Sequence, residues 1–222
     1  MFNRVLLIDD EKNFRDPAVR LFGSKGFRME AVGTGKEARQ RGKSRRFDFA
    51  VVDLRIAEED GIDVAAELQK LQQDLPVAFL TAWDSDDARK RAAAKGIEPF
   101  AWYSKPLPAS KQQLDFFCTD MRTSALTDRF RRLALRWRFE TRHSSSIHEI
   151  AMHPAYQSII GMGTEAVPLI IAQLRRRPEH WFWALKAITD DDPVPPAARG
   201  NLQAMAATWI EWAEEHLPQG KK

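Results

Sequence analysis

The stretch Phe49-Ala50-Val51-Val52-Asp53-Leu54 is an apolar run with a carboxylate at its end. A short, continuous apolar run predicts a strand that is buried on both faces, as the strands of parallel sheets are. The run Val5–Ile8 is followed in the same way by Asp9-Asp10, and a third apolar run ends near Lys105-Pro106. In an open parallel sheet the carboxyl ends of the strands share one edge, where ligands bind. We therefore expect three carboxylates and one ammonium group to meet there.

Up to about Met121, short apolar runs alternate with longer amphipathic stretches, which is the pattern of βα units around a parallel sheet. The expected strands are Arg4–Ile8, Arg28–Ala31, Phe49–Asp53, Val77–Thr81 and Phe100–Tyr103. The expected helices lie near Phe14–Gly23, Gly35–Arg41, Ile62–Gln72 and Asp84–Lys95, with a fifth from about Ala109. This alternation predicts an α/β, flavodoxin-like fold with a five-stranded parallel sheet in a (βα)5 arrangement.

Composition limits the class of protein. The chain has 222 residues, of which 44% are hydrophobic and 29% charged, so it is long enough for one large or two modest globular domains. Its single cysteine, Cys118, excludes an intrachain disulfide and fits a reducing compartment. No apolar stretch approaches the roughly 18 residues of a transmembrane helix, and the first residues lack the pattern of a signal peptide. We expect a cytoplasmic protein without a membrane partner.

Residues 122–146 form an expected connector between two domains. Leu126, Phe130, Leu133 and Trp137 make an apolar stripe at helical spacing, with several arginines beside it. The stripe requires burial, either within the chain or against a second copy in a homodimer, and the sequence leaves both open. The run His143-Ser144-Ser145-Ser146 is short and polar, as linkers are.

The C-terminal part predicts a small all-α domain over residues 147–222, after a first domain at residues 1–121. Glycine and proline breakers separate its apolar segments, and no strand pattern occurs among them. The expected helices are Ile147–Met152, Pro154–Ile160, Thr164–Arg176, Trp181–Thr189 and Gly200–His216.

The residues at the strand ends suit phosphoryl chemistry. Mg²⁺ prefers oxygen ligands, which Asp10 and Asp53 would supply together with one backbone carbonyl, while Asp9 would act through water. Clustered carboxylates repel one another, so we expect raised pKa values or a recruited cation. Asp53 would then attack a phosphoryl group as a nucleophile, with Lys105 as a fixed positive charge and Thr81 as a hydroxyl donor.

At this point the sequence resembles the receiver domain of two-component response regulators, the CheY-like family. The resemblance covers about Met1 to Met121, and no family is recognised for the helical part that follows. Each motif is weak alone, but together they occur in the family's order. They are Asp9-Asp10-Glu11 after the first strand, Asp53 after the third, the Asp60-Gly61 turn, Leu80-Thr81-Ala82 at the fourth strand and Lys105-Pro106 after the fifth.

The resemblance implies that Asp53 accepts a phosphoryl group from a histidine kinase or a phosphotransfer protein. It implies a phosphoacceptor rather than an enzyme, with at most slow autodephosphorylation. The Mg²⁺ ligands that it implies are the carboxylates of Asp9, Asp10 and Asp53 and the carbonyl of Arg55. The other implied roles are hydrogen bonding to the phosphoryl group by Thr81, ion pairing with it by Lys105, and an aromatic switch that couples Trp102 to Thr81.

Two positions depart from the family pattern. Ala57 stands where a proline is frequent, which leaves the loop after the phosphoacceptor less constrained. Trp102 is bulkier than the usual tyrosine or phenylalanine, so its inward rotation is hindered, and a ring packed permanently on the fourth helix is the alternative.

The C-terminal domain is expected to contact a protein partner that the sequence does not identify. Its segment Trp181–Ile188 is nearly apolar, whereas a DNA-recognition helix needs polar side chains aimed at base edges. A DNA-binding transcriptional output is the alternative. The clustered tryptophans Trp181, Trp183, Trp209 and Trp212 fill a small core or line a partner groove, and the histidines lack zinc-ligand spacing.

Overall fold

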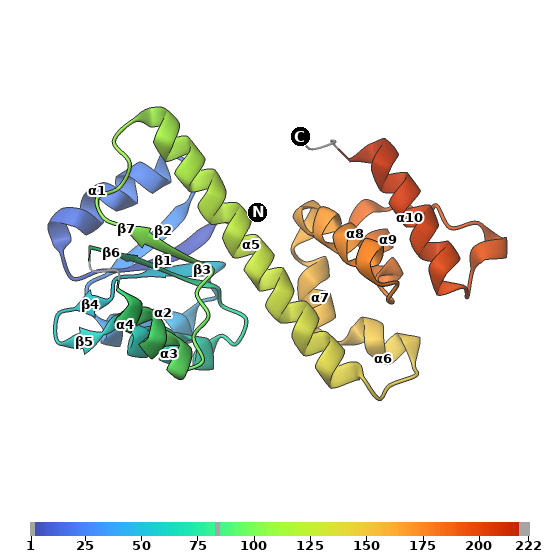
Figure 1. Cartoon of the computed structure of the whole chain (residues 1–222), viewed down its shortest axis with the longest axis horizontal. Coiled ribbons are helices and arrows are strands. Elements are labelled where there is room, and N and C mark those ends of the chain that lie inside the picture. The colour runs from blue at the N-terminus through green and yellow to red at the C-terminus, as the bar shows by residue number, and fades with distance from the viewer. Residues whose placement is uncertain (1–2, 83–84, 218–222) are drawn as a thin grey trace. The chain divides into compact units, whose positions relative to one another are not determined.

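The structure is a computed structural model that describes residues 3–82 and 85–217 (Figure 1). It divides into two compact units between Arg129 and Phe130, inside one long helix. We call residues 3–129 the N-terminal unit and residues 130–217 the helical unit. The expected connector, residues 122–146, is therefore divided, and its residues from 130 onward belong to the helical unit.

The N-terminal unit is built on a five-stranded sheet in the order β2-β1-β3-β6-β7, and all neighbouring strands are parallel. This is the strand order of flavodoxin-like folds, so the predicted fold class is confirmed. The strands are β1 (Arg4–Ile8), β2 (Arg28–Val32), β3 (Phe49–Val52), β6 (Val77–Thr81) and β7 (Ala101–Ser104).

Helices cover both faces of this sheet because alternate strand residues point to opposite sides (Figure 1). Val5 and Leu7 of β1 pack with α1 and α5, whereas Leu6 and Ile8 pack in the core formed with α2, α3 and α4. The helices are α1 (Lys12–Gly23), α2 (Gly35–Ser44), α3 (Gly61–Leu71), α4 (Asp86–Ala94) and α5 (Lys111–Thr141). Asp84, where the fourth helix was predicted to begin, lies outside the described residues.

A short antiparallel hairpin, β4 (Arg55–Ile56) and β5 (Glu59–Asp60), follows β3 and was not predicted. Two-residue strands are too short to show a hydrophobic alternation. Ala57 turns the hairpin with a φ of 52°, in the left-handed region that non-glycine residues rarely adopt. Proline fixes φ near −65°, so the residue frequent here in the family is incompatible with this turn.

The helical unit contains helices and no strand in residues 130–217. Three predicted helices of this unit begin later than expected, the one from Trp181 by a single residue. Residues 163–166 form a separate 3₁₀ turn ahead of α8, with Pro168 in the first turn of that helix, and Asn201 caps α10 with its side chain. The helices are α6 (Ile147–Met152), α7 (Pro154–Ile160), α8 (Val167–Arg176), α9 (Phe182–Thr189) and α10 (Leu202–His216), with the 3₁₀ turns Gly163–Ala166 and Pro196–Ala198.

Trp181 is the centre of the helical unit's core. It is fully buried, with its ring 4.3 Å from Trp137, 5.5 Å from Tyr156 and 5.8 Å from Phe130 between ring centroids. Trp137 and Phe130 come from the stripe on α5, so this part of the stripe is buried within the chain and is not left as a seam for a second copy. Among the tryptophans, Trp209 is also buried, whereas Trp183 is 57% exposed.

Candidate phosphoacceptor site

Three predicted site residues meet at the carboxyl edge of the sheet. The Nζ atom of Lys105 lies 2.7 Å from Asp9 Oδ2 and 2.5 Å from Asp53 Oδ2. The side chains of Asp9, Asp53 and Lys105 are only 1%, 9% and 10% exposed. Two carboxylates thus share one ammonium group in a nearly water-free position.

The sheet itself fixes these side chains. Each of the three residues extends the hydrogen-bond ladder one step beyond its strand: Asp9 N donates to Val32 O, Asp53 N to Ile8 O, and Lys105 N to Thr81 O. Thr81 is the buried last residue of β6, so its hydroxyl belongs to the same edge. The geometry follows from parallel strands that end in register.

Gly61 lies close to the backbone carbonyl of Asp53, and this contact fixes the loop after Asp53. A Cβ atom at Gly61 would lie 1.8 Å from the carbonyl oxygen of Asp53, so only glycine fits, and its N–H donates to Leu54 O. The neighbouring Asp60 caps α3 by accepting from Ile62 N and also pairs with Arg91 of α4. The Asp60-Gly61 turn therefore fixes the backbone of Asp53 against two helices.

Burial and charge act in opposite directions at this site. Burial raises the pKa of Asp9, the Asp53 charge adds to the rise, and the two outweigh the hydrogen bond from Lys105. Burial alone would lower the pKa of Lys105, but its hydrogen bonds to Asp53 and Asp9 outweigh that effect and raise it. Lys105 therefore stays protonated, and the site has two carboxylates for this one ammonium group.

The donor set fits a hard divalent cation in its chemistry. The two buried carboxylates already bracket one cation, the Lys105 ammonium, and carboxylate oxygens are preferred Mg²⁺ ligands. Asp10 is exposed, and Arg55 N approaches Asp53 Oδ1 at 3.4 Å. Within residues 3–82 and 85–217, no three acidic, histidine or cysteine side chains gather closely enough to enclose a metal ion. The full ligand set of Asp9, Asp10, Asp53 and the Arg55 carbonyl therefore stays a prediction.

Two site neighbours escaped the sequence reasoning. The ring of Phe14 lies under the Lys105 ammonium, 4.3 Å from its centroid, and Arg15 Nη1 donates to the carbonyl of Asp9 at 2.5 Å. Both lie in the first turns of α1, directly after Asp9-Asp10. Their closeness in sequence to these acids was the only available signal.

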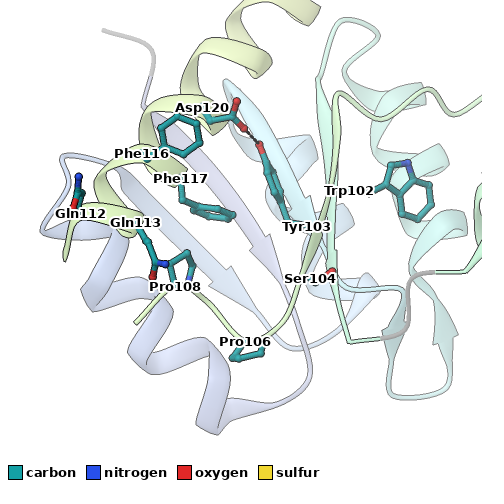
Figure 2. Close-up of a pocket in the computed structure, with 10 residues that line it drawn as sticks. All are labelled: Trp102, Tyr103, Ser104, Pro106, Pro108, Gln112, Gln113, Phe116, Phe117 and Asp120. Atoms are coloured by element: carbon teal, nitrogen blue, oxygen red, sulfur yellow. Dashed lines mark hydrogen bonds between the residues drawn. The ribbon is translucent and has the colours of Figure 1, made fainter. Parts of the chain in front are cut away.

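Trp102 and Tyr103 point to opposite sides of β7 (Figure 2). The Trp102 ring packs on Phe79, with 4.6 Å between centroids, and the guanidinium of Arg89 from α4 lies 4.8 Å from it. On the other side Tyr103 donates to Asp120 of α5 at 3.0 Å, beside a cavity of about 780 Å³. Trp102 thus sits in a place that would allow a switch, and its switching stays a prediction.

A family model described as the response regulator receiver domain matches residues 5–113. The N-terminal unit is a response regulator receiver domain. For the receiver domain, curated relatives include the transcriptional regulatory protein ZraR of Klebsiella oxytoca, 29% identical over 110 residues, which are 50% of this chain and 24% of ZraR. The response regulator MprA of Mycolicibacterium vanbaalenii is 30% identical over 111 residues, 50% of this chain and 46% of MprA. The chain thus spans less than half the length of these relatives.

Solved structures agree on the fold of the receiver domain. The signal receiver domain of a protein described as a LuxO repressor from Vibrio parahaemolyticus aligns with a TM-score of 0.50 and 21% identity, covering 60% of this chain and 98% of that one. The family model stops at residue 113, so the helical unit lies outside it. No helix in the described ranges is long and apolar enough to cross a membrane.

Proposed function

We propose that this two-component response regulator accepts a phosphoryl group on Asp53, with Mg²⁺, from a histidine kinase or a phosphotransfer protein. The observation that carries the proposal is the pair of buried carboxylates, Asp9 and Asp53, on one Lys105 ammonium. Such a site is short of positive charge and would attract a divalent cation, which in turn would supply the positive charge that an anionic phosphoryl group requires. Cys118, the single cysteine of the sequence, is free and buried, which fits a reducing compartment and supports a cytoplasmic location.

In the proposed reaction a carboxylate oxygen of Asp53 attacks the phosphorus, and the bond from phosphorus to the donor's nitrogen breaks as that nitrogen takes a proton. The product is an aspartyl phosphate. Bound Mg²⁺ would supply positive charge for the phosphoryl oxygens and the carboxylates. Asp9, Asp10, Asp53 and the Arg55 carbonyl would hold it. Lys105, which bonds Asp53 Oδ2 here, would turn that hydrogen bond to a phosphoryl oxygen.

The buried position of Thr81 supports a role after transfer. Its hydroxyl lies at the end of β6, next to the Lys105 backbone that its carbonyl already holds. A phosphoryl group on Asp53 would attract this hydroxyl, which lies two residues along β6 from Phe79, the ring that packs on Trp102. Phosphorylation would thereby bias the packing of Trp102 against α4.

We propose a protein partner for the helical unit. Its α9 exposes Trp183, Lys186 and Ala187. A recognition helix presents polar side chains to base edges, which this face lacks except for Lys186. The competing proposal, a DNA-binding output, draws on the name of the curated relative ZraR, whose match lies in the receiver domain.

Labelling with acetyl phosphate tests the phosphoacceptor. The wild type should gain one acid-stable, base-labile phosphoryl group in the presence of Mg²⁺, and Asp53→Asn should gain none. Glu58→Gln, in the neighbouring hairpin turn, serves as a control that should label. Equal labelling of wild type and Asp53→Asn would reject the assignment.

A duplex-binding assay at several salt concentrations separates the two outputs. Specific binding that weakens steeply as salt rises would favour the DNA-binding output, because phosphate contacts release counterions. A single protein partner that binds the full chain and is lost with Trp183→Ala would favour the protein-interaction output.

A further inference from the structure

We propose that Phe14 is a positioning residue that holds the Lys105 ammonium in the site while the carboxylates bind other groups. The inference rests on the proposed phosphoryl transfer. An ammonium has three donors, and here two of them reach Asp9 and Asp53, at 2.7 and 2.5 Å. Glu11 is the next acid, at 3.9 Å, beyond hydrogen-bond distance. The Phe14 ring, 4.3 Å from Nζ, lies within the range of a cation–π contact.

The chain fixes Phe14 in this place. The ring is half-buried and packs against the core beneath α1 and α5. Its neighbour Arg15 donates to the Asp9 carbonyl at 2.5 Å, which ties the first turn of α1 to the strand end that carries Asp9. The ring is therefore held in a fixed position relative to the site.

The ring differs from the carboxylates in what it can bind. A divalent cation takes up carboxylate oxygens, and it would compete with Lys105 for Asp9 and Asp53. Phenylalanine offers no ligand atom to Mg²⁺, yet its face attracts an ammonium. Asp9 and Asp53 would bind the metal ion or the phosphoryl group. The Phe14 ring binds neither, so its contact with the Lys105 ammonium would persist. Lysine is long and flexible, so without this contact its ammonium would move toward water.

The test measures the initial rate of acetyl phosphate labelling of the full chain at saturating Mg²⁺. Phe14→Leu should lower the rate about 3- to 30-fold, the range of a partly buried cation–π contact, and Phe14→Tyr, which keeps the ring, should stay near the wild type. Phe116→Leu, at a 76% exposed position on α5, is the matched control and should have no effect. A Phe14→Leu rate equal to the wild type would overturn the proposal.

A double-mutant cycle separates positioning from packing. If Phe14 acts through the ammonium, Phe14→Leu should add no loss of rate in a Lys105→Met background. An equal loss in both backgrounds would overturn the proposal, because the ring would then matter only for packing.

The same cycle on urea unfolding without Mg²⁺ needs no phosphorylation. The unfolding equilibrium constants should show a coupling of about threefold or more between the two positions, and additive effects would count against Phe14. Absence of labelling in the wild type would instead reject the proposed function, while this second cycle still decides the role of Phe14.

Discussion

Each unit of this protein contains a close ionic cluster, and the two clusters differ in burial and in charge: no side chain of the first is more than 10% exposed, whereas Arg138 in the second is 31% exposed. In the receiver domain two carboxylates, Asp9 and Asp53, share the single ammonium of Lys105. In the helical unit one guanidinium, Arg138, meets one carboxylate, Glu179, at 2.6 Å. The first set has more carboxylates than cations, whereas in the second Glu179 also has the exposed guanidinium of Arg177 at 3.9 Å.

The hydrogen bonds of the Arg138–Glu179 pair connect it to other side chains of the helical unit. Arg138 donates through Nε and Nη2 to both Glu179 oxygens and also to Gln173, and Glu179 accepts in addition from the indole N–H of Trp181. The pair therefore orients the central tryptophan of the core. An ion pair whose carboxylate already accepts from a guanidinium and an indole stabilises an arrangement of helices.

The contrast shows that a close ion pair does not by itself mark a functional site. Burying charge is costly, and the receiver domain buries two carboxylates with one ammonium at a sheet edge where strands end together. The excess carboxylate is the property that attracts a divalent cation, which would supply the positive charge that a phosphoryl group requires.

The largest expected effect is on the helical unit. Trp181→Ala should lower its free energy of unfolding by about 3–5 kcal/mol, because a fully buried indole is replaced by a cavity and Glu179 loses a donor. Urea unfolding followed by circular dichroism measures this. Trp183→Ala, at a 57% exposed position two residues further along the chain, should change it by no more than about 0.5 kcal/mol.

Labelling with acetyl phosphate should survive both of these tryptophan substitutions, because the phosphoacceptor lies in the other unit. Loss of labelling in Trp181→Ala would mean that the receiver domain depends on the helical unit for its fold, and the contrast between the units would break down.

Gly61→Ala should act on the receiver site with a smaller effect. Its Cβ would collide with the Asp53 carbonyl, so the backbone of the phosphoacceptor must shift, and we expect the labelling rate to fall about tenfold or more. Gly96→Ala is the matched control, because Gly96 has a φ of 70° but free space around its Cβ position. It should cost about 1 kcal/mol of stability and leave labelling unchanged. Equal labelling of all three proteins would show that the turn does not position Asp53.

The sequence was sufficient for the elements that repeat a simple pattern. Apolar runs predicted all five strands of the sheet, and their ends predicted that Asp9, Asp53 and Lys105 would meet, whereas Asp10, expected with them, is exposed. The hairpin with Ala57 was missed because two-residue strands carry no period. These predictions worked because parallel strands place their ends by topology alone.

Which side chains face the core and which face solvent was harder to predict. In the nearly apolar segment Trp181–Ile188 every helical phase looks equally hydrophobic, so the sequence did not separate buried Trp181 from exposed Trp183. The Arg138–Glu179 pair joins residues 41 positions apart, and no local pattern links them. The Phe14 contact depends on the direction of one ring, which spacing does not define.

Alkaline pH should affect the receiver domain first. Burial raises the pKa of the Cys118 thiol from 9.0 to about 11. Between these values the unfolded chain loses the proton and the folded one keeps it, so stability falls as the pH rises. Two pKa units set an upper limit of about 2.7 kcal/mol, and we expect about 1–2. In the helical unit burial raises the pKa of Tyr156 from 10.0. The loss of stability in that unit should therefore begin about one pH unit higher than in the receiver domain.

Urea unfolding at pH 8, 9, 10 and 11 measures both losses. Cys118→Ala should remove the pH dependence of the receiver domain between pH 9 and 10, and Tyr156→Phe should leave that window unchanged. A wild-type curve that is flat up to pH 11 would contradict the predicted burial of the thiol.

The smallest expected effect compares two residues with a left-handed backbone, one in each unit: Ala57 after the phosphoacceptor, with φ 52°, and Asp190 at the end of α9, with φ 58°. Glycine adopts this conformation without the Cβ clash, which costs other residues about 1–2 kcal/mol. Ala57→Gly should therefore stabilise the receiver domain by about 1 kcal/mol, after subtraction of the extra conformational entropy that glycine gives the unfolded chain. Asp190→Gly should gain less, because aspartate tolerates the left-handed region better than alanine. Ala57→Pro should destabilise instead, since its ring fixes φ near −65°. Urea midpoints of the three variants measure the order, and a stabilising Ala57→Pro would show that the hairpin turn takes a different backbone conformation, in which a proline after Asp53 is tolerated.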